Sequence, residues 1–206
     1  VTTPARQALL QDISAQFAAI KPALDALPQQ AIHNDINDHN ILVTGRLSEP
    51  RAISGLIDLG DMCAAPRICN LAIAAAYLVL GADDPERRLA ALVRGYHATN
   101  PLDAAELDLL WPLLRMRLAV SVVNSTLCAQ DFPDDPYVII SQAPSWAFLE
   151  TVSLDAGLLR ARLRTACGLP VTEAAPRIWA YLNETRGQFA PVMGADLSEA
   201  PMGSLS

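Results

Sequence analysis

The stretch His33-Asn34-Asp35-Ile36-Asn37-Asp38-His39-Asn40 carries seven polar side chains in eight positions and lies between two apolar segments. A polar group that is buried without a partner costs roughly 1–3 kcal/mol. A run of this kind is therefore typical of a solvated or functional loop. We take residues 33–40 as the stretch that decides both the fold and the site.

A second polar motif, Asp58-Leu59-Gly60-Asp61, follows the apolar run 53–57. An acidic residue at the end of an apolar strand, followed by glycine, can present a carboxylate to a metal ion that prefers oxygen ligands. The apolar runs 41–43 and 52–59 lie on either side of a turn marked by Gly45 and Pro50. This arrangement predicts a short β-hairpin between the two polar motifs.

Helical spacing of apolar residues dominates the rest of the chain. We expect Pro22 to kink or end the first helix and Pro112 to break the fourth. From about residue 187 the sequence is rich in Gly, Pro, Ser and Met without periodicity, which predicts an irregular tail or linker. The fold class is mainly α with a small β-hairpin. The expected helices are 4–27, 67–80, 84–99, 101–128, 141–165 and 172–185.

Composition excludes some classes of function. The 206 residues carry a formal charge of −7 and no Lys/Arg run, which argues against a nucleic-acid partner. The longest apolar run, 71–80, is too short to span a membrane. No signal peptide is visible and the four cysteines are scattered, which predicts buried free thiols in a cytoplasmic protein. The cysteines are Cys63, Cys69, Cys128 and Cys167.

The spacing His33-x-Asp35-x4-Asn40 resembles the catalytic loop of the protein-kinase-like superfamily, and Asp58-Leu59-Gly60 resembles its metal-binding motif. The connection between the two motifs is short, and no room is left for a long activation segment before Pro66. The chain is thus similar to the aminoglycoside phosphotransferase and choline kinase group. It most resembles hydroxylysine kinase and the phosphotransferase domains fused to class III aminotransferases. The resemblance covers about residues 5–165, and its stretches are 37–42, 53–62, 101–117, Asp135-x-Tyr137 and Trp146.

This resemblance implies roles for the two motifs. Asp35 would accept or orient the proton of a substrate hydroxyl, and His33 would brace the loop by hydrogen bonding. Asn40 and Asp58 would hold Mg²⁺ on the phosphates of ATP or GTP. Asp38 and Asp61 lie beside these positions and are candidates for holding a substrate ammonium group.

A polar stripe on the expected helix 101–128 has two interpretations. Arg117, Ser121 and Asn124 fall at positions i, i+4 and i+7 among apolar residues. They form either a solvent face with helix-crossing hydrogen bonds, or a substrate-facing stripe in which Arg117 binds a carboxylate with two hydrogen bonds. The sequence leaves both open.

The chain departs from the family pattern in three places. Asn34 stands where many relatives have glycine, and Asn70 stands where the family usually has an acidic residue that ties its helix to the catalytic loop. No Gly-rich phosphate loop and no strand-borne lysine precede the first helix, so the nucleotide-binding residues are unknown. The resemblance therefore implies that residues 1–186 form a C-terminal lobe, inactive alone, and that 187–206 form a tail or a linker. An N-terminal lobe and possibly an aminotransferase domain would complete a longer parent protein.

The leading functional hypothesis is a nucleotide- and Mg²⁺-dependent kinase that acts on a small hydroxylated amine or amino acid. One alternative is a metal-dependent hydrolase with His33, Asp35, His39 and Asp61 as ligands. Another is a catalytically silent helical module of a fusion protein. The sequence does not choose between ATP and GTP, and it names neither the substrate nor the oligomeric state.

Overall fold

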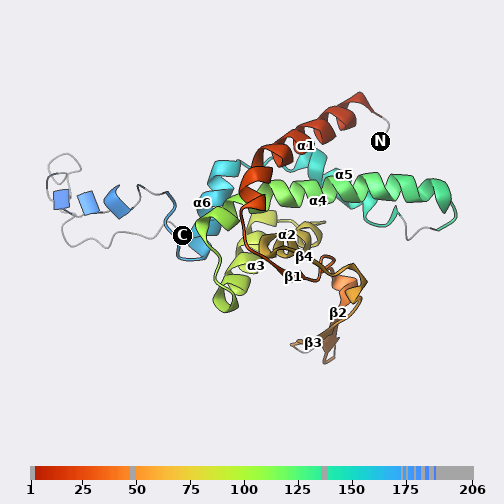
Figure 1. Ribbon diagram of the computed structural model, residues 1–206, viewed down its shortest axis with the longest axis horizontal. Coiled ribbons are helices and arrows are strands. Elements are labelled where there is room, and N and C mark those ends of the chain that lie inside the picture. The colour runs from red at the N-terminus through yellow and green to blue at the C-terminus, as the bar shows by residue number, and fades with distance from the viewer. Residues whose placement is uncertain are drawn as a thin grey trace.

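The computed structural model describes residues 3–46, 50–135 and 139–172, together with single positions and short pieces between 174 and 188. These residues are mostly helical, and two small antiparallel sheets accompany the helices (Figure 1). One sheet pairs β1 (Gln29–Ile32) with β4 (Cys63–Pro66), and the other pairs β2 (Ile41–Thr44) with β3 (Ala52–Leu56). The helices are α1 (Pro4–Asp25), α2 (Arg67–Leu78), α3 (Pro85–Thr99), α4 (Ala104–Asp131), α5 (Gln142–Thr151) and α6 (Ala156–Ala166).

Side chains at the helix N-termini explain where four of these helices begin. Thr3, Asp84, Asp103 and Asp155 stand immediately before α1, α3, α4 and α6. Each accepts a hydrogen bond from the main-chain N–H three residues later, at 2.7–3.2 Å. These bonds satisfy N–H groups that have no partner inside the helix.

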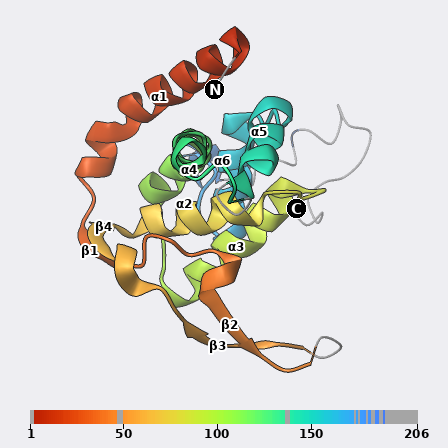
Figure 2. The ribbon, with the colours of Figure 1, turned by 90° about the vertical axis from the view of Figure 1, so that its right-hand side faces the viewer.

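The core forms around α4, against which α1, α2, α5 and α6 pack (Figure 2). Leu110, Leu114, Leu118 and Val122 recur every four residues along α4, and each is at most 2% exposed. Full burial of one such side chain contributes about 1.5–3 kcal/mol. This packing positions α2 and α4, which carry residues of the site described below.

The predicted hairpin and the mainly helical class are confirmed, but three helix predictions are wrong. α1 continues through Pro22, and α4 continues through Pro112. Packing on several sides of α4 compensates for the hydrogen bond that proline removes. The predicted helix 141–165 is two helices, because Asp155 starts a new one after the extended Val152.

Two regions lie partly or wholly outside the described residues. Within the predicted helix 172–185, the described positions 176–178, 180–181 and 184–185 are helical. The predicted tail 187–206 lies outside, apart from residue 188. Across the part of the chain that is described, no helix has both the length and the apolar character that crossing a membrane requires.

The cysteines are free, as predicted, but two of them are not buried. Cys63 and Cys128 are exposed, whereas Cys69 and Cys167 are half-buried. Burial raises the pKa of the Cys69 and Cys167 thiols.

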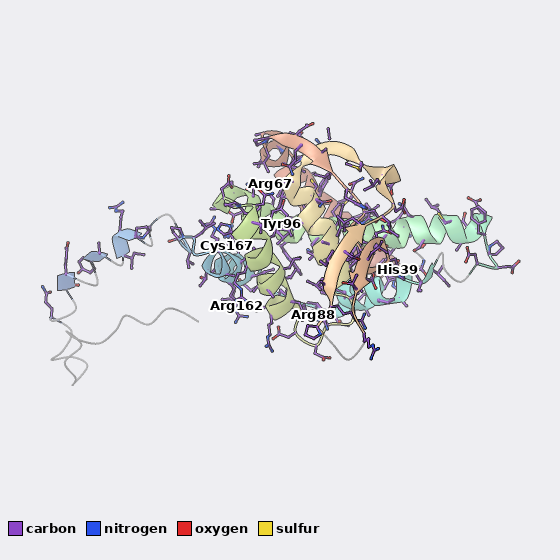
Figure 3. The ribbon with its side chains drawn as sticks, turned by 90° about the horizontal axis from the view of Figure 1, so that it is seen from below. His39, Arg67, Arg88, Tyr96, Arg162 and Cys167 are labelled. Carbon is purple, nitrogen blue, oxygen red and sulfur yellow. The ribbon has the colours of Figure 1, made fainter. Side chains whose placement is uncertain are left out.

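Arg67 joins the start of α2 to the start of α4 (Figure 3). Its Nε and Nη2 atoms bind the two carboxylate oxygens of Glu106 at 2.6 and 2.8 Å. Nη2 also donates to the main-chain oxygen of Pro101, and Glu106 accepts a further bond from the Asp103 N–H. Burial of Glu106 opposes its charged form, but the bonds from Arg67 and Asp103 outweigh it and hold the pKa of Glu106 below its ordinary value.

Replacing Arg67 with Met is expected to lower the free energy of unfolding at pH 7 by about 2–3 kcal/mol, because it leaves the buried Glu106 carboxylate without its partner. In the wild type, the lowered pKa of Glu106 gives a stability that is complete above its ordinary value of 4.5 and is lost as the pH falls through the folded-state value. The difference between the two proteins should therefore shrink below pH 4.5. Urea unfolding at pH 7 and pH 4 measures it, and an undiminished difference at pH 4 would contradict the assignment.

Candidate active site

The two polar motifs are held side by side because a sheet lies at each end of both. Residues 33–40 leave β1 and enter β2, whereas residues 57–62 leave β3 and enter β4. β1 pairs with β4, so that Ile32 lies opposite Cys63. β2 pairs with β3, so that Ile41 lies opposite Leu56. Two loops that are distant in sequence therefore begin and end next to each other (Figure 2).

Ile57, directly before Asp58, is bound on both sides of its peptide unit by the catalytic loop. Its N–H donates to the Asn40 main-chain oxygen at 3.1 Å, and its C=O lies 2.8 Å from His33 Nε2. His33 Nδ1 accepts a hydrogen bond from the Asp35 N–H at 3.3 Å. The hydrogen of the ring is therefore on Nε2, which donates to Ile57. His33 is buried and makes these contacts within the two loops.

Asn34 adopts a left-handed backbone conformation, with φ of 67°. Asparagine tolerates this region better than most residues with a side chain, which accounts for Asn at a position where many relatives have Gly. The Asn34 N–H donates to Asn70 Oδ1 on α2 at 3.1 Å. Asn70 therefore supplies an acceptor for the catalytic loop, although it lacks the charge of the acidic residue usual in the family.

We expect Asn34→Ala to lower the free energy of unfolding by about 1 kcal/mol, because Ala enters the left-handed region at a cost. Asn34→Gly should be close to neutral, since Gly adopts this conformation freely and keeps the N–H that binds Asn70. Chemical denaturation of both variants measures the difference. Equal stability of the Ala and Gly variants would show that this conformation does not constrain the loop.

The Asp35 carboxylate accepts hydrogen bonds from four side chains. Oδ1 lies 2.7 Å from Arg117 Nη2 and 3.5 Å from the Tyr77 hydroxyl. Oδ2 accepts from the side-chain amides of Asn37 at 3.0 Å and Asn40 at 3.1 Å. An ionised carboxylate has about four acceptor positions. The carboxylate is thus fixed in orientation, and its longest and weakest contact is the one from Tyr77.

Arg117 reaches Asp35 from the middle of α4. Its Nη2 also donates to the Tyr77 hydroxyl at 2.9 Å, and its guanidinium lies 5.5 Å from the centre of the Tyr77 ring. The side chains of Arg117 and Asp35 are 28% and 21% exposed, so their charges are partly shielded from water. The sequence analysis did not identify Tyr77 or Asn37. The polar character of residues 33–40 was the available signal for Asn37, and none pointed to Tyr77.

Asn40 and Asp58 are the residues that could hold a divalent cation. The Asn40 amide nitrogen is used by Asp35, which leaves its amide oxygen as an acceptor. Asp58 is exposed and adopts a left-handed conformation, with φ of 61°. No hydrogen bond or ion pair joins its carboxylate to another described residue. One carboxylate and one amide oxygen suit Mg²⁺, which keeps several waters and binds few protein ligands.

A transition-metal site of the hydrolase type is not found in the described residues. No group of three or more His, Cys, Asp or Glu side chains among them is arranged to hold a metal ion. Both ring nitrogens of His33 are engaged by main-chain groups. Asp61 is exposed, in the short 3₁₀ turn Leu59–Asp61.

A cavity of about 930 Å³ opens beside Asp35. The catalytic loop contributes Asp38 and His39, and further residues come from α2, α3, α4 and the start of α5. All three members of the predicted polar stripe line the cavity, namely Arg117, Ser121 and Asn124. Ser121 Oγ also lies 3.2 Å from Ser141 Oγ, so the stripe makes a cross-segment hydrogen bond as well. Asp35 lies at the wall between this cavity and the Asp58 motif.

Trp146 is not among the residues that line the cavity. It is buried, and the guanidinium of Arg6 lies 4.4 Å from the centre of its ring. Arg6 also pairs with Glu150 at 2.6 Å. Trp146 therefore belongs to the packing between α1 and α5.

Comparison with known proteins points to one family. The sequence model described as "Phosphotransferase enzyme family" matches residues 2–110. Hydroxylysine kinase from Xenopus laevis is 29% identical over 153 residues, which cover 71% of this chain and 41% of that protein. The Mus musculus hydroxylysine kinase is 29% identical over 123 residues (57% of this chain, 33% of that protein) and the Danio rerio one 30% over 123 residues (59% and 35%). No solved structure matches significantly.

The chain spans less than half the length of these curated relatives. The family match nevertheless covers more than half of the chain's 206 residues, and it includes both polar motifs and the sheets that join them. The chain therefore belongs to the phosphotransferase enzyme family.

Proposed function

We propose that this chain is the phosphoryl-transfer part of a small-molecule kinase. The kinase moves the γ-phosphate of ATP or GTP to a hydroxyl group of a small amine or amino acid. The observation that carries the proposal is the double contact of Ile57 with His33 and Asn40. This contact joins the loop of Asp35, the candidate base, to the motif of Asp58, the candidate metal ligand.

Asp35 accepts the proton of the substrate hydroxyl while the hydroxyl oxygen bonds to the γ-phosphorus and the bond to the leaving diphosphate oxygen breaks. Asn37, Asn40 and Arg117 fix the carboxylate in orientation, and proper positioning supplies much of the catalysis in phosphoryl transfer. Since the Tyr77 contact at 3.5 Å is the weakest, the substrate hydroxyl takes that position on Oδ1.

Asn40 and Asp58 are the residues that would hold Mg²⁺, which would neutralise charge on the nucleotide phosphates. The exposed Asp58 carboxylate and its lack of a described partner support this role. The resemblance to the kinase motifs is its second support, since both residues stand at the motif positions.

We further propose that residues 1–186 act as a C-terminal lobe in a longer cytoplasmic protein. The sequence contains no Gly-rich loop or strand-borne lysine for the nucleotide phosphates, and the relatives are more than twice as long as the part that matches. Another segment would supply those groups. Residues 187–206 would serve as a tail or as a linker, possible partners being the remaining lobe and an aminotransferase domain.

The direct test is a turnover assay of the full-length gene product with ATP and GTP against hydroxylated amines and amino acids. The expected product is a phosphomonoester that forms only with Mg²⁺ present. Asp25→Asn serves as the matched control, because this exposed carboxylate of α1 pairs with Lys21 and does not line the cavity. Absence of turnover together with no effect of Asp35→Asn would refute the proposal.

A further inference from the structure

The charged side chains that line the cavity fall into two groups. Asp35 and Arg117 bind each other at 2.7 Å, so their charges are mutually compensated. Asp38 and Arg88 line the same cavity, and neither forms an ion pair within the described part of the chain. The wall therefore presents one carboxylate and one guanidinium whose charges are free to bind a ligand.

Arg88 is oriented by the end of α2. Its Nη1 donates to the Leu78 main-chain oxygen at 3.1 Å, and Tyr77, Leu78 and Leu80 from this end of α2 also line the cavity. Figure 3 shows Arg88 on α3 and His39 on the catalytic loop, and both belong to the same cavity. A guanidinium has five N–H donors in a planar fork that suits a carboxylate. One contact to Leu78 leaves most of this fork available.

We propose that Arg88 binds a carboxylate of the substrate while Asp38 binds its ammonium group. The cavity thus selects hydroxylated amino acids over amino alcohols. This inference rests on the proposed function, in which Asp35 takes the substrate hydroxyl. An amino alcohol would use two of these three side chains, whereas a hydroxylated amino acid uses all three. Ala74, Leu92 and Val120 line the same cavity and provide apolar contact for the carbon chain that joins the three groups.

Arg117 is the competing candidate for the carboxylate, and its contacts disfavour it. Its Nη2 is already bound to Asp35 and Tyr77, and its Nε is buried without a partner, where a ligand has no access. A carboxylate bound at Arg117 would also lie next to the Asp35 carboxylate and be repelled by it. Arg88 binds no carboxylate among the described residues and carries no such penalty.

The test compares two probes that differ only in charge, 5-hydroxylysine and its carboxamide, by calorimetric titration of the full-length protein. The wild type should bind the acid at least about tenfold more tightly than the amide. Arg88→Gln should remove this preference by weakening the acid alone. Arg87→Gln is the matched control, since Arg87 neighbours Arg88 on α3 but does not line the cavity.

Three results would overturn the inference. They are equal binding of acid and amide to the wild type, equal weakening of both probes by Arg88→Gln, and no binding of the acid at all. The turnover assay separates this failure from failure of the proposed function. Phosphorylation of amino alcohols but not of amino acids would leave the kinase proposal intact and would remove the role of Arg88.

Discussion

Asp35→Asn is expected to lower turnover of the full-length kinase by about a thousandfold, because general-base catalysis typically contributes 10²- to 10⁴-fold. The amide has nearly the same shape as the carboxylate but cannot accept the hydroxyl proton. It also offers one oxygen in place of two, so it cannot accept from Arg117 and from Asn37 and Asn40 together. The main effect should be on kcat, with a small change in KM, because Asp35 acts on the reacting proton.

Steady-state kinetics with saturating nucleotide measures this effect, and circular dichroism establishes that the variant is folded. Asp25→Asn, on the exposed side of α1, is the control and should retain full activity. If the variant with Asn at position 35 is folded and retains more than about a tenth of the wild-type kcat, Asp35 is not the base.

The second large effect is expected for Asp58→Asn. Asparagine adopts the left-handed conformation of Asp58 readily, so the backbone of the motif should be kept while the negative charge is lost. Mg²⁺ is a hard cation that binds through very few carboxylates, so loss of one should lower turnover at least about a hundredfold at limiting Mg²⁺. High Mg²⁺ should restore part of the rate.

A magnesium titration of the turnover rate checks this prediction. Asp83→Asn is a suitable control, because Asp83 is an exposed carboxylate outside both polar motifs. An unchanged dependence on Mg²⁺ in Asp58→Asn would assign the metal to other residues.

The local parts of the fold could be predicted from the sequence because they depend on short-range chemistry. Gly45 and Pro50 mark the turn of the β2–β3 hairpin, and Asp84-Pro85 marks the start of α3. The pairing of β1 with β4 could not be predicted, because these short segments show no alternation and meet only through tertiary structure. Continuation of α4 through Pro112 likewise depends on the packing around it.

The candidate site was predictable where one motif carries it and not where several elements meet. Residues 33–40 and Asp58 form a recognisable spacing along the chain. Tyr77 and Arg88 were missed, because their relevance comes from the cavity that α2, α3 and α4 enclose. Arg117 was identified as polar on an apolar helix, but its partner Asp35 is distant in sequence and could not be assigned.

The central claim is a division of labour, in which Asp35 handles the proton and Asp58 the metal on two loops joined at Ile57. Binding of Mn²⁺, a spectroscopic substitute for Mg²⁺, tests it most directly when measured by electron paramagnetic resonance with ATP present. The account predicts wild-type affinity for Asp35→Asn and at least about tenfold weaker binding for Asp58→Asn. Equal affinity in the two variants, or weaker binding in Asp35→Asn alone, would contradict it.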